Sequence, residues 1–227
     1  MAPAPAYDLW AAAYDDQPNN LMLQLDEMLF GAFLDKVSIE NKMIVDVGCG
    51  TGRHWQRIFE RKPAQLSGYD VSVGMLEVLK TKFPLAVTHL LSGNHLTATA
   101  DNSVDVLIST LTVAHIKDID AALKEWNRVL KQGADVFITD YHPAILQKGG
   151  ERTFSHDNKT LSVKNYVHSI EKIKQLAKDL GWKVVSLTEK RVDESVKHFY
   201  ETAGALKVYE MYKDMPVIYS IHFKKEG

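Results

Sequence analysis

The feature of this 227-residue sequence that most constrains its fold is an apolar run that ends in closely spaced glycines. Lys42–Val47 is typical of a buried β-strand, and Gly48, Gly50 and Gly52 follow it before a helical stretch at 54–60. Glycine permits the positive φ angles of a sharp turn and leaves room where a ligand approaches the backbone. The helix that follows directs its free amides and the positive end of its dipole at the loop. The sequence therefore predicts a strand–loop–helix unit that binds an anionic group, although a simple tight turn would also fit the pattern.

An acidic residue, Asp70, occupies the position expected for contact with a nucleoside bound at this loop. It follows the second apolar run, Gln65–Tyr69, about 20 residues after Gly50, which is the separation seen in nucleotide-binding α/β folds. The second strand of such a sheet lies beside the first, so a carboxylate at its end can accept hydrogen bonds from both ribose hydroxyls. Asp70 could instead cap the helix expected at 73–82, which Ser72 also suits, and the two roles can coexist.

The rest of the chain alternates between strand and helix patterns. An unbroken apolar run such as Val104–Ser109 indicates a strand covered on both faces of a parallel sheet. Strands are expected at 42–47, 65–69, 86–91, 104–109, 134–139, 183–188 and 217–223, the last of which is expected to end the sheet. Helices are expected at 18–37, 54–60, 73–82, 121–130, 169–180 and 194–203. This alternation predicts an α/β fold.

No repeat or linker divides the chain, so we expect a single domain over 1–227. An N-terminal helical lid at 1–40 precedes a cofactor-binding core at 42–142. The glycines and polar residues beyond the fifth strand predict an inserted loop or hairpin at 143–168. The remainder, 169–227, is expected to complete the sheet.

Composition argues against several classes of protein. The net charge of −2 gives no basic surface to attract nucleic acid or an anionic membrane, so we expect no nucleic-acid partner. The single cysteine, Cys49, cannot form an internal disulfide, which favours a cytoplasmic location. No stretch approaches the roughly 18 apolar residues of a membrane span, and residues 1–6 do not read as a signal peptide.

Sequence blocks between residues 42 and 142 resemble those of class I S-adenosylmethionine-dependent methyltransferases, especially the small-molecule branch that includes the ubiquinone and menaquinone biosynthesis enzymes. The blocks are Val45–Gly52, Gly68–Leu76, Asp101–Ser109 and Trp126–Gly133. The resemblance implies a Rossmann-like, mostly parallel sheet of seven strands with helices on both faces and an antiparallel last strand. It also implies S-adenosylmethionine as cofactor, and methyl transfer to an oxygen, nitrogen or carbon atom of a small-molecule acceptor.

The resemblance assigns residues to the cofactor. Asp70 would bind the ribose and Met75 would lie near the adenine. Related sequences usually carry an acidic residue after the third strand, whereas this chain has Asn94, whose carbonyl oxygen can accept a hydrogen bond from the adenine amino group. The residues expected to bind the cofactor are Asp46, Gly48, Cys49, Gly50, Gly52, Asp70, Val71, Met75, Asn94, His95, Ser109 and Tyr14.

The N-terminal segment, which resembles the lid of this family, contains three regularly spaced aromatic residues. Tyr7, Trp10 and Tyr14 could close over a positively charged sulfonium or stack on a planar acceptor. The same spacings of three and four residues also suit ordinary packing on one face of a helix. Of the three, Tyr14 is the one expected to contact the cofactor.

Two histidines follow central strands at the edge where an α/β sheet binds its ligands. We expect His115 or His142 to face the transferred methyl group and to act as a general base or an orienting hydrogen-bond partner. The inserted segment at 143–168 resembles the part of this family's fold that covers the methyl acceptor, and His156 and His168, in and after it, are weaker candidates. No spacing of histidines, cysteines and acidic residues predicts a metal site.

Two other functional classes remain as alternatives. A NAD(P)-dependent oxidoreductase also uses a glycine loop and an acidic residue, but its fingerprint would place a third glycine where this chain has Arg53. A non-catalytic, methyltransferase-like binding subunit would share every motif described above. Methyl transfer itself needs no catalytic nucleophile, because the donor is already activated and positioning can supply most of the catalysis.

Overall fold

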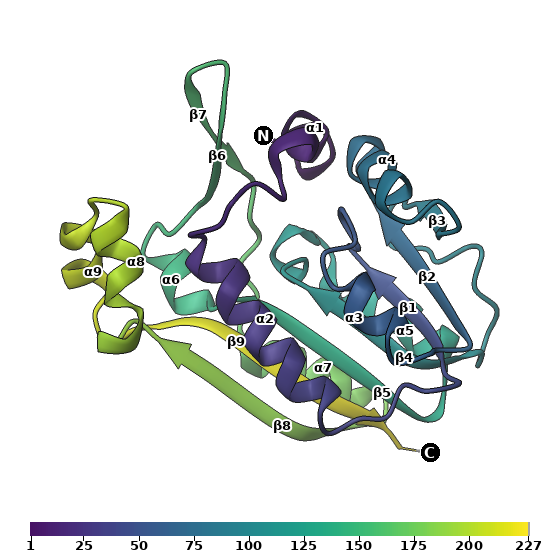
Figure 1. The fold of residues 1–227 in the computed structure, drawn as a ribbon. Helices are drawn as coiled ribbons and strands as arrows, with labels where there is room; N and C mark the ends of the chain where they lie inside the picture. The colour runs from purple at the N-terminus through teal and green to yellow at the C-terminus, as the bar shows by residue number, and fades with distance from the viewer. Residues whose placement is uncertain (227) are drawn as a thin grey trace.

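The predicted strand–loop–helix unit lies at the centre of the sheet in the computed structural model, which describes residues 1–226 (Figure 1). Seven strands form this sheet in the order β3-β2-β1-β4-β5-β9-β8. Their bounds are β1 Met43–Val47, β2 Gln65–Asp70, β3 Val87–Leu90, β4 Val104–Thr110, β5 Leu130–Tyr141, β8 Trp182–Arg191 and β9 Pro216–Lys225. The last strand, β9, runs antiparallel to its two neighbours, β5 and β8. The neighbouring strands from β3 through β2, β1 and β4 to β5 all pair parallel. The Rossmann-like α/β fold expected from the sequence is confirmed.

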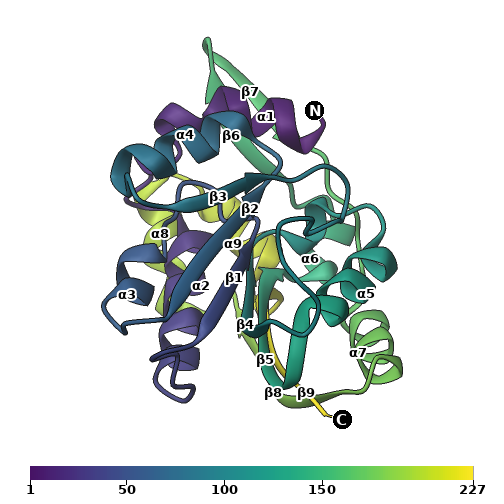
Figure 2. The ribbon, with the colours of Figure 1, turned by 90° about the vertical axis from the view of Figure 1, so that its right-hand side faces the viewer.

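Helices cover both faces of the sheet (Figure 2). Alternate strand residues point to opposite sides, so that Ile44 packs with α2 and α3 while its neighbour Val45 packs with α5 and α7. The helices are α1 Pro3–Trp10, α2 Leu21–Leu34, α3 Trp55–Phe59, α4 Val73–Lys82, α5 Ile119–Val129, α6 Pro143–Gln147, α7 Ile170–Asp179, α8 Lys197–Thr202 and α9 Leu206–Tyr212, with short 3₁₀ turns at Ala11–Ala13, Val113–His115 and Glu194–Val196. No helix within residues 1–226 is both long and apolar enough to cross a membrane.

The inserted segment at 143–168 begins with the short helix α6, which the sequence did not predict, and continues as a hairpin, one of the two forms expected. Strands β6 Arg152–His156 and β7 Lys159–Val163 pair antiparallel as a separate small sheet beside α1 (Figure 1). The ring of Phe154 on β6 stacks on Trp10 of α1 with centroids 4.8 Å apart. Ala6 of α1 and Val163 of β7 belong to the same buried apolar cluster, so the N-terminal helix and the hairpin form one packing unit.

The structure corrects several expected boundaries. Helix α5 ends at Val129 and β5 begins at once, so Gly133 lies within a strand with a φ angle of +73° instead of ending the helix. The expected helix at 194–203 is a short turn followed by α8, and α9 was not anticipated. Strand β9 does not end the sheet, because β8 lies outside it. Nearly every residue of β9 is buried, whereas β8 is exposed along most of its length, which is the pattern of an edge strand.

The expected lid at 1–40 divides into two parts that pack against different regions of the protein. Helix α1 lies over the carboxyl ends of the central strands, next to α4 (Figure 1). Helix α2, which Asn20 caps by accepting the amides of Met22 and Leu23, packs instead on β5 and β9. Only the residues before α2 are therefore placed to cover a ligand.

Helix α2 is anchored to the glycine loop by a buried carboxylate. Asp26 is fully buried and accepts hydrogen bonds from Arg53, His54 and Thr139, with 2.8 Å between its Oδ2 and the His54 Nε2. Burial alone would raise the pKa of Asp26, but the charge of Arg53 and the hydrogen bond from His54 hold it below its usual value. Arg53 and His54 directly follow Gly52, so this cluster joins the first sheet-covering helix to the end of the glycine loop.

We predict that Asp26→Ala lowers the free energy of unfolding by about 3 kcal/mol, since it removes the buried carboxylate that Arg53 and His54 share and leaves them only the half-exposed carboxylate of Glu27. Urea denaturation measures this loss. Asp35→Ala is the matched control, because Asp35 ends the same helix in an exposed pair with Arg61 and should cost at most about 1 kcal/mol. Similar small losses in both variants would show that the Asp26 cluster does not anchor the helix.

Candidate active site

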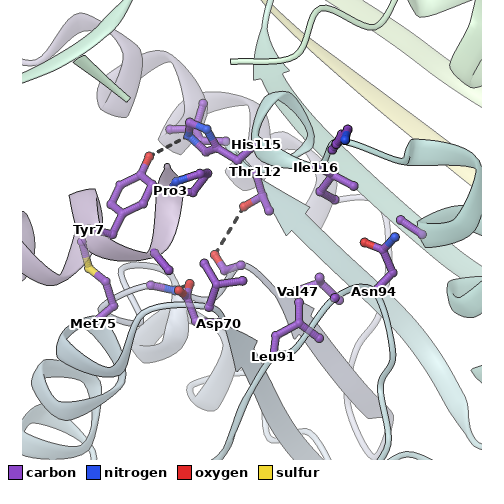
Figure 3. Close-up of a pocket in the computed structure, with 18 of the residues that line it drawn as sticks. Pro3, Tyr7, Val47, Asp70, Met75, Leu91, Asn94, Thr112, His115 and Ile116 are labelled. Atoms are coloured by element: carbon purple, nitrogen blue, oxygen red, sulfur yellow. Dashed lines mark hydrogen bonds between the residues drawn. The ribbon is translucent and has the colours of Figure 1, made fainter. Parts of the chain in front are cut away.

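A cavity of about 420 Å³ opens at the carboxyl ends of β1, β2 and β4, beneath α1 (Figure 3). Its floor comes from the glycine loop and from the residues after β2, β3 and β4, and its cover from residues 2–4, Tyr7 and Tyr14. A crevice at this edge is where open α/β sheets bind their ligands. Of the residues expected from the sequence, the cavity wall includes Tyr14, Gly48, Gly50, Asp70, Val71, Met75, Asn94 and His115.

The glycines of the loop are needed for different reasons. Gly48 has a φ of +76°, and a Cβ at this position would overlap the Thr112 side chain. Gly50 has a φ of +51°, and no protein atom lies within 4 Å of the place where its Cβ would be. The space beside Gly50 belongs to the cavity, so its backbone can be approached closely by a ligand. Gly52 faces Leu79 and Trp55 and does not line the cavity.

Asp70 joins the loop to the second strand. Its Oδ2 accepts the amide of Gly50 at 2.8 Å, and its Oδ1 accepts the amide of Ser72 at 2.9 Å. Burial raises the pKa of Asp70 above its ordinary value, and the hydrogen bonds from these amides oppose that rise. A carboxylate has about four acceptor sites, so two remain for the hydroxyls of a ribose. Ser72 is the residue that caps α4, by accepting the amide of Met75, so the capping role that the sequence also allowed for Asp70 belongs to Ser72.

Asn94 lies at the other end of the cavity and presents an acceptor to it. Its Nδ2 donates to the backbone carbonyl of Asp118 at 3.2 Å, which fixes the amide orientation and leaves Oδ1 without an internal partner (Figure 3). An oxygen in that position suits the amino group of adenine. Met75 lies across the cavity from Asn94, under α1 and close to Tyr7, so the two residues expected beside the adenine are not neighbours (Figure 3).

The remaining expected cofactor residues do not reach the cavity. Asp46, Cys49 and Ser109 are buried within the sheet and behind the loop, and His95 is exposed beside Glu125. These expectations followed a continuous stretch of sequence, whereas a strand presents only every second residue to one side. Glycine loops also turn some side chains inward, as Cys49 shows by packing against Gly68.

The structure also places His142 away from the cavity, contrary to the expectation from the sequence. Its Nδ1 accepts the amide of Ala144 and caps α6, and its Nε2 lies 3.0 Å from Glu189 on the edge strand β8. Asp140, two residues earlier and still within β5, contacts Ala114 and Arg152 instead. His142 lies beyond the end of β5, as the residue that caps α6, so the strand alternation no longer sets the direction of its side chain. His142 therefore does not line the cavity. The weaker candidates are also engaged elsewhere, with His156 beside Asp157 and His168 bound to the carbonyl of Ile116.

His115 forms a hydrogen-bonded pair with Tyr7 at the end of the cavity opposite Asn94 (Figure 3). The phenol oxygen lies 2.8 Å from Nε2, and Nδ1 lies 3.1 Å from the carbonyl of Lys164. A carbonyl can only accept, so Nδ1 carries the proton and Nε2 accepts from Tyr7. Burial and the nearby charge of Arg152 lower the pKa of His115 well below its ordinary value, so the imidazole is neutral at pH 7.

Arg152 and Asp140 lie behind this end of the cavity, where Arg152 contacts residues of the cavity wall, and neither was predicted from the sequence. The guanidinium lies 3.1 Å from the Tyr7 hydroxyl and 2.9 Å from the Asp140 carboxylate, and it also contacts His115. Asp140 could have been found, since it ends a central strand at the ligand-binding edge. No signal marks Arg152, because its partners lie on segments far away in the chain.

The geometry defines a nucleoside-binding α/β protein: a glycine loop, a carboxylate after the second strand and an acceptor amide after the third surround one cavity. The space beside Gly50 and the free acceptor sites of Asp70 and Asn94 fit S-adenosylmethionine. Within residues 1–226, no group of three or more histidine, cysteine or acidic side chains is placed to hold a metal ion.

Comparison with known proteins names the family. Residues 45–138 match a methyltransferase domain. An uncharacterized methyltransferase of Emericella nidulans is 28% identical over 235 residues, covering 84% of this chain and 81% of the relative. A ubiquinone/menaquinone biosynthesis C-methyltransferase of Campylobacter jejuni is 31% identical over 113 residues, 47% of each chain. A phosphoethanolamine N-methyltransferase of Haemonchus contortus, solved with phosphomonomethylethanolamine and S-adenosylhomocysteine, has the same fold with a TM-score of 0.66 at 17% identity, over 96% of this chain and 57% of its own.

The chain carries a class I S-adenosylmethionine-dependent methyltransferase domain, which the family model matches over residues 45–138. The resemblance noted from the sequence blocks is confirmed, including the relative from quinone biosynthesis. This chain spans about half the length of that relative and of the Haemonchus enzyme, and most of the length of the Emericella protein.

We predict that Gly50→Ala folds but loses cofactor binding, because its methyl group enters the space beside the loop and its left-handed backbone is strained by about 1–2 kcal/mol. Gly133→Ala is the matched control. It has a comparable positive φ and equally open surroundings, but it lies away from the cavity. Calorimetry with S-adenosylhomocysteine should show normal binding in the control alone. Normal binding by Gly50→Ala would show that the loop is only a tight turn with no part in cofactor binding.

Asp46 gives the domain a pH-dependent stability. Its Oδ2 accepts the indole N–H of Trp55 at 2.9 Å, while Oδ1 is buried without a partner. Burial raises its pKa to about 6, from 3.8 in an unperturbed side chain. The folded protein therefore binds this proton more tightly than the unfolded chain does, and the contribution of Asp46 to stability falls as the pH rises between these two values.

We predict that Asp46→Asn gains stability relative to the parent protein as the pH rises from about 4 to 7, by up to about 3 kcal/mol, since two pKa units correspond to that amount. The asparagine oxygen can keep the hydrogen bond from Trp55. Urea denaturation at several pH values measures the difference between the two proteins. Parallel stability curves would show that Asp46 is not the group responsible.

Proposed function

We propose that this enzyme methylates a small molecule, which binds at the end of the cavity formed by Tyr7, Tyr14, Leu111 and His115. The observation that carries the proposal is the division of one small cavity. Asp70, Gly50 and Asn94 offer hydrogen-bonding groups suited to the nucleoside of the cofactor, and the opposite end remains for an acceptor. A volume of about 420 Å³ beneath α1 suits a small acceptor and leaves little room for a folded macromolecule.

The acceptor end supplies neutral groups. Tyr7, Tyr14 and His115 are uncharged, and the charge of Arg152 is compensated by Asp140. The phenol rings can also lie over a cationic centre, either the sulfonium of the donor or an ammonium of the acceptor. The relatives named above differ in the atom that they methylate, because one is a C-methyltransferase and the other an N-methyltransferase. Oxygen, nitrogen and carbon acceptors all remain compatible with such a wall.

When bound, S-adenosylmethionine supplies an activated methyl group on its sulfonium. The chain has to hold the acceptor atom in line with that methyl group and exclude water, and the covered cavity suits both tasks. We assign His115 an orienting role over that of a general base. Its Nε2 already accepts a hydrogen bond, and a proton placed there would lie beside the Arg152 guanidinium.

We predict that Asp70→Ala weakens the binding of S-adenosylmethionine by about 1.5–3 kcal/mol, the usual contribution of hydrogen bonds to a charged group. Isothermal titration calorimetry measures it. Asp101→Ala is a suitable control, since Asp101 is exposed and pairs with Arg128 away from the cavity. NADH should not bind either protein, and unchanged affinity in Asp70→Ala would contradict the ribose assignment.

The acceptor class is tested by supplying methyl-labelled S-adenosylmethionine together with separate small-molecule, protein and nucleic-acid fractions of a cell extract. The proposal expects label only in the small-molecule fraction, and the Gly50→Ala variant should give none. Label in the protein or nucleic-acid fraction would overturn the proposed acceptor class while leaving the methyltransferase assignment intact.

A further inference from the structure

One buried cation is not explained by cofactor binding. Arg152, the first residue of β6, is only 5% exposed, and its neighbours come from four other parts of the chain. Its Nη1 donates to the carbonyl of Leu111 at 2.6 Å and to the Tyr7 hydroxyl at 3.1 Å, and its Nη2 donates to Asp140 at 2.9 Å. The guanidinium also lies 4.4 Å from the centre of the Tyr141 ring. Such a residue has to be held by its surroundings, since burying an arginine without partners is very unfavourable.

The charge of Arg152 is already compensated. Asp140 is 1% exposed, and its carboxylate also accepts the amides of Ala114 and Tyr141 at 2.6 and 2.7 Å. It is thereby fixed at the end of β5 in an orientation that faces the guanidinium. Arg152 therefore has little capacity left to bind an anionic acceptor, and a different role is needed to account for its position.

That position is against the pair formed by Tyr7 and His115. The groups facing the imidazole are the Tyr7 phenol from α1, the Arg152 guanidinium from β6 and the backbone carbonyl of Lys164 after β7. A cation beside Nε2 keeps a proton off that atom, while the carbonyl keeps a proton on Nδ1. The Tyr7 oxygen then donates to His115, accepts from Arg152 and keeps one lone pair for an N–H or O–H of the acceptor.

We propose that Arg152 is a positioning residue for the acceptor: when the β6–β7 hairpin packs against α1, the guanidinium enters between Asp140 and the Tyr7–His115 pair and fixes that pair in one hydrogen-bonded arrangement. The proposal rests on the proposed function for the identity of the acceptor end. The arrangement itself is a property of the protein alone and can be measured without a substrate.

The test uses ring-nitrogen NMR of isotopically labelled histidine in the full-length protein. In the parent protein, His115 should remain neutral, with its proton on Nδ1, between about pH 5 and 8. Arg152→Met removes the charge and keeps an unbranched side chain, so the pKa of His115 should rise toward its ordinary value while burial still holds it below, and a protonated imidazole should become detectable at the acidic end of the series. Arg152→Lys restores a cation and should restore the neutral imidazole. The indole signal of Trp10 reports in each variant whether the hairpin still packs on α1.

A purely structural role for Arg152 gives a different result. In that case the methionine and lysine variants would behave alike, and His115 would keep its neutral state in both while the hairpin stays packed. Either observation overturns the proposal. Where Arg152→Met fails to fold, Tyr7→Phe decides: it removes the phenol donor and leaves Arg152 in place, so His115 should stay neutral, and protonation of His115 in this variant would show that Tyr7 sets its state.

These measurements separate the proposal from the proposed function. Binding of S-adenosylmethionine should be the same in the parent protein and in both Arg152 variants, because Arg152 does not line the cavity and forms no hydrogen bond with Asp70, Gly50 or Asn94. A protein that transfers no methyl group to a small molecule, yet shows the expected His115 states, would refute the function and retain the positioning role.

Discussion

The carboxylate of Asp70 is the interaction on which the cofactor half of this enzyme depends. It accepts one amide from the glycine loop and another from the start of α4, and so it fixes the spacing between the ends of β1 and β2. The amides of Gly48 and Cys49 donate to the carbonyl of Tyr69, directly before Asp70, which reinforces the same spacing. A single buried acidic group thus holds the loop open in the conformation that a ligand requires. Burying it is unfavourable, and the amides offset that penalty.

Polar contacts connect the N-terminal segment to the glycine loop and to α4. Asp8 accepts from the Ser72 hydroxyl at 2.6 Å and from the amide of Gly74 at 3.0 Å, at the start of α4. Asp15 accepts from the Thr51 hydroxyl and from Lys82, both at 2.7 Å. Asp8 contacts α4, and Asp15 contacts the glycine loop and α4. Both elements line the cavity, so its cover is positioned relative to the end proposed to hold the cofactor.

The sequence predicted which segments of the chain form the cofactor end of the cavity, but not which of their side chains face it, since Asp46, Cys49 and Ser109 are buried elsewhere. Gly48, Gly50, Asp70 and Asn94 lie within a short stretch whose strand order is governed by local rules, and all four line the cavity. His142 was misplaced because the rule that locates ligands at strand ends does not say which way a side chain faces.

The hairpin residues illustrate the other limit of the sequence. Nothing near Arg152 in the chain indicates that it meets Tyr7, Leu111 and Asp140, since that encounter depends on how the hairpin packs against α1. The buried state of Arg152 is likewise a tertiary property, because an arginine in a polar segment is most often exposed. The same applies to β9, whose insertion between β5 and β8 depends on long-range pairing.

The contacts that build the two ends of the cavity join residues at very different distances along the sequence. The contact between Gly50 and Asp70 joins residues 20 positions apart, whereas those between Tyr7 and Arg152 and between residues 1 and 162 span 145 and 161 positions. Closing longer loops costs more conformational entropy, so contacts of high separation form efficiently only after the intervening chain is ordered. The order of assembly follows: the donor site matures with the parallel sheet, and the acceptor site is completed last, when the two distant ends of its cover meet over a sheet that is already built.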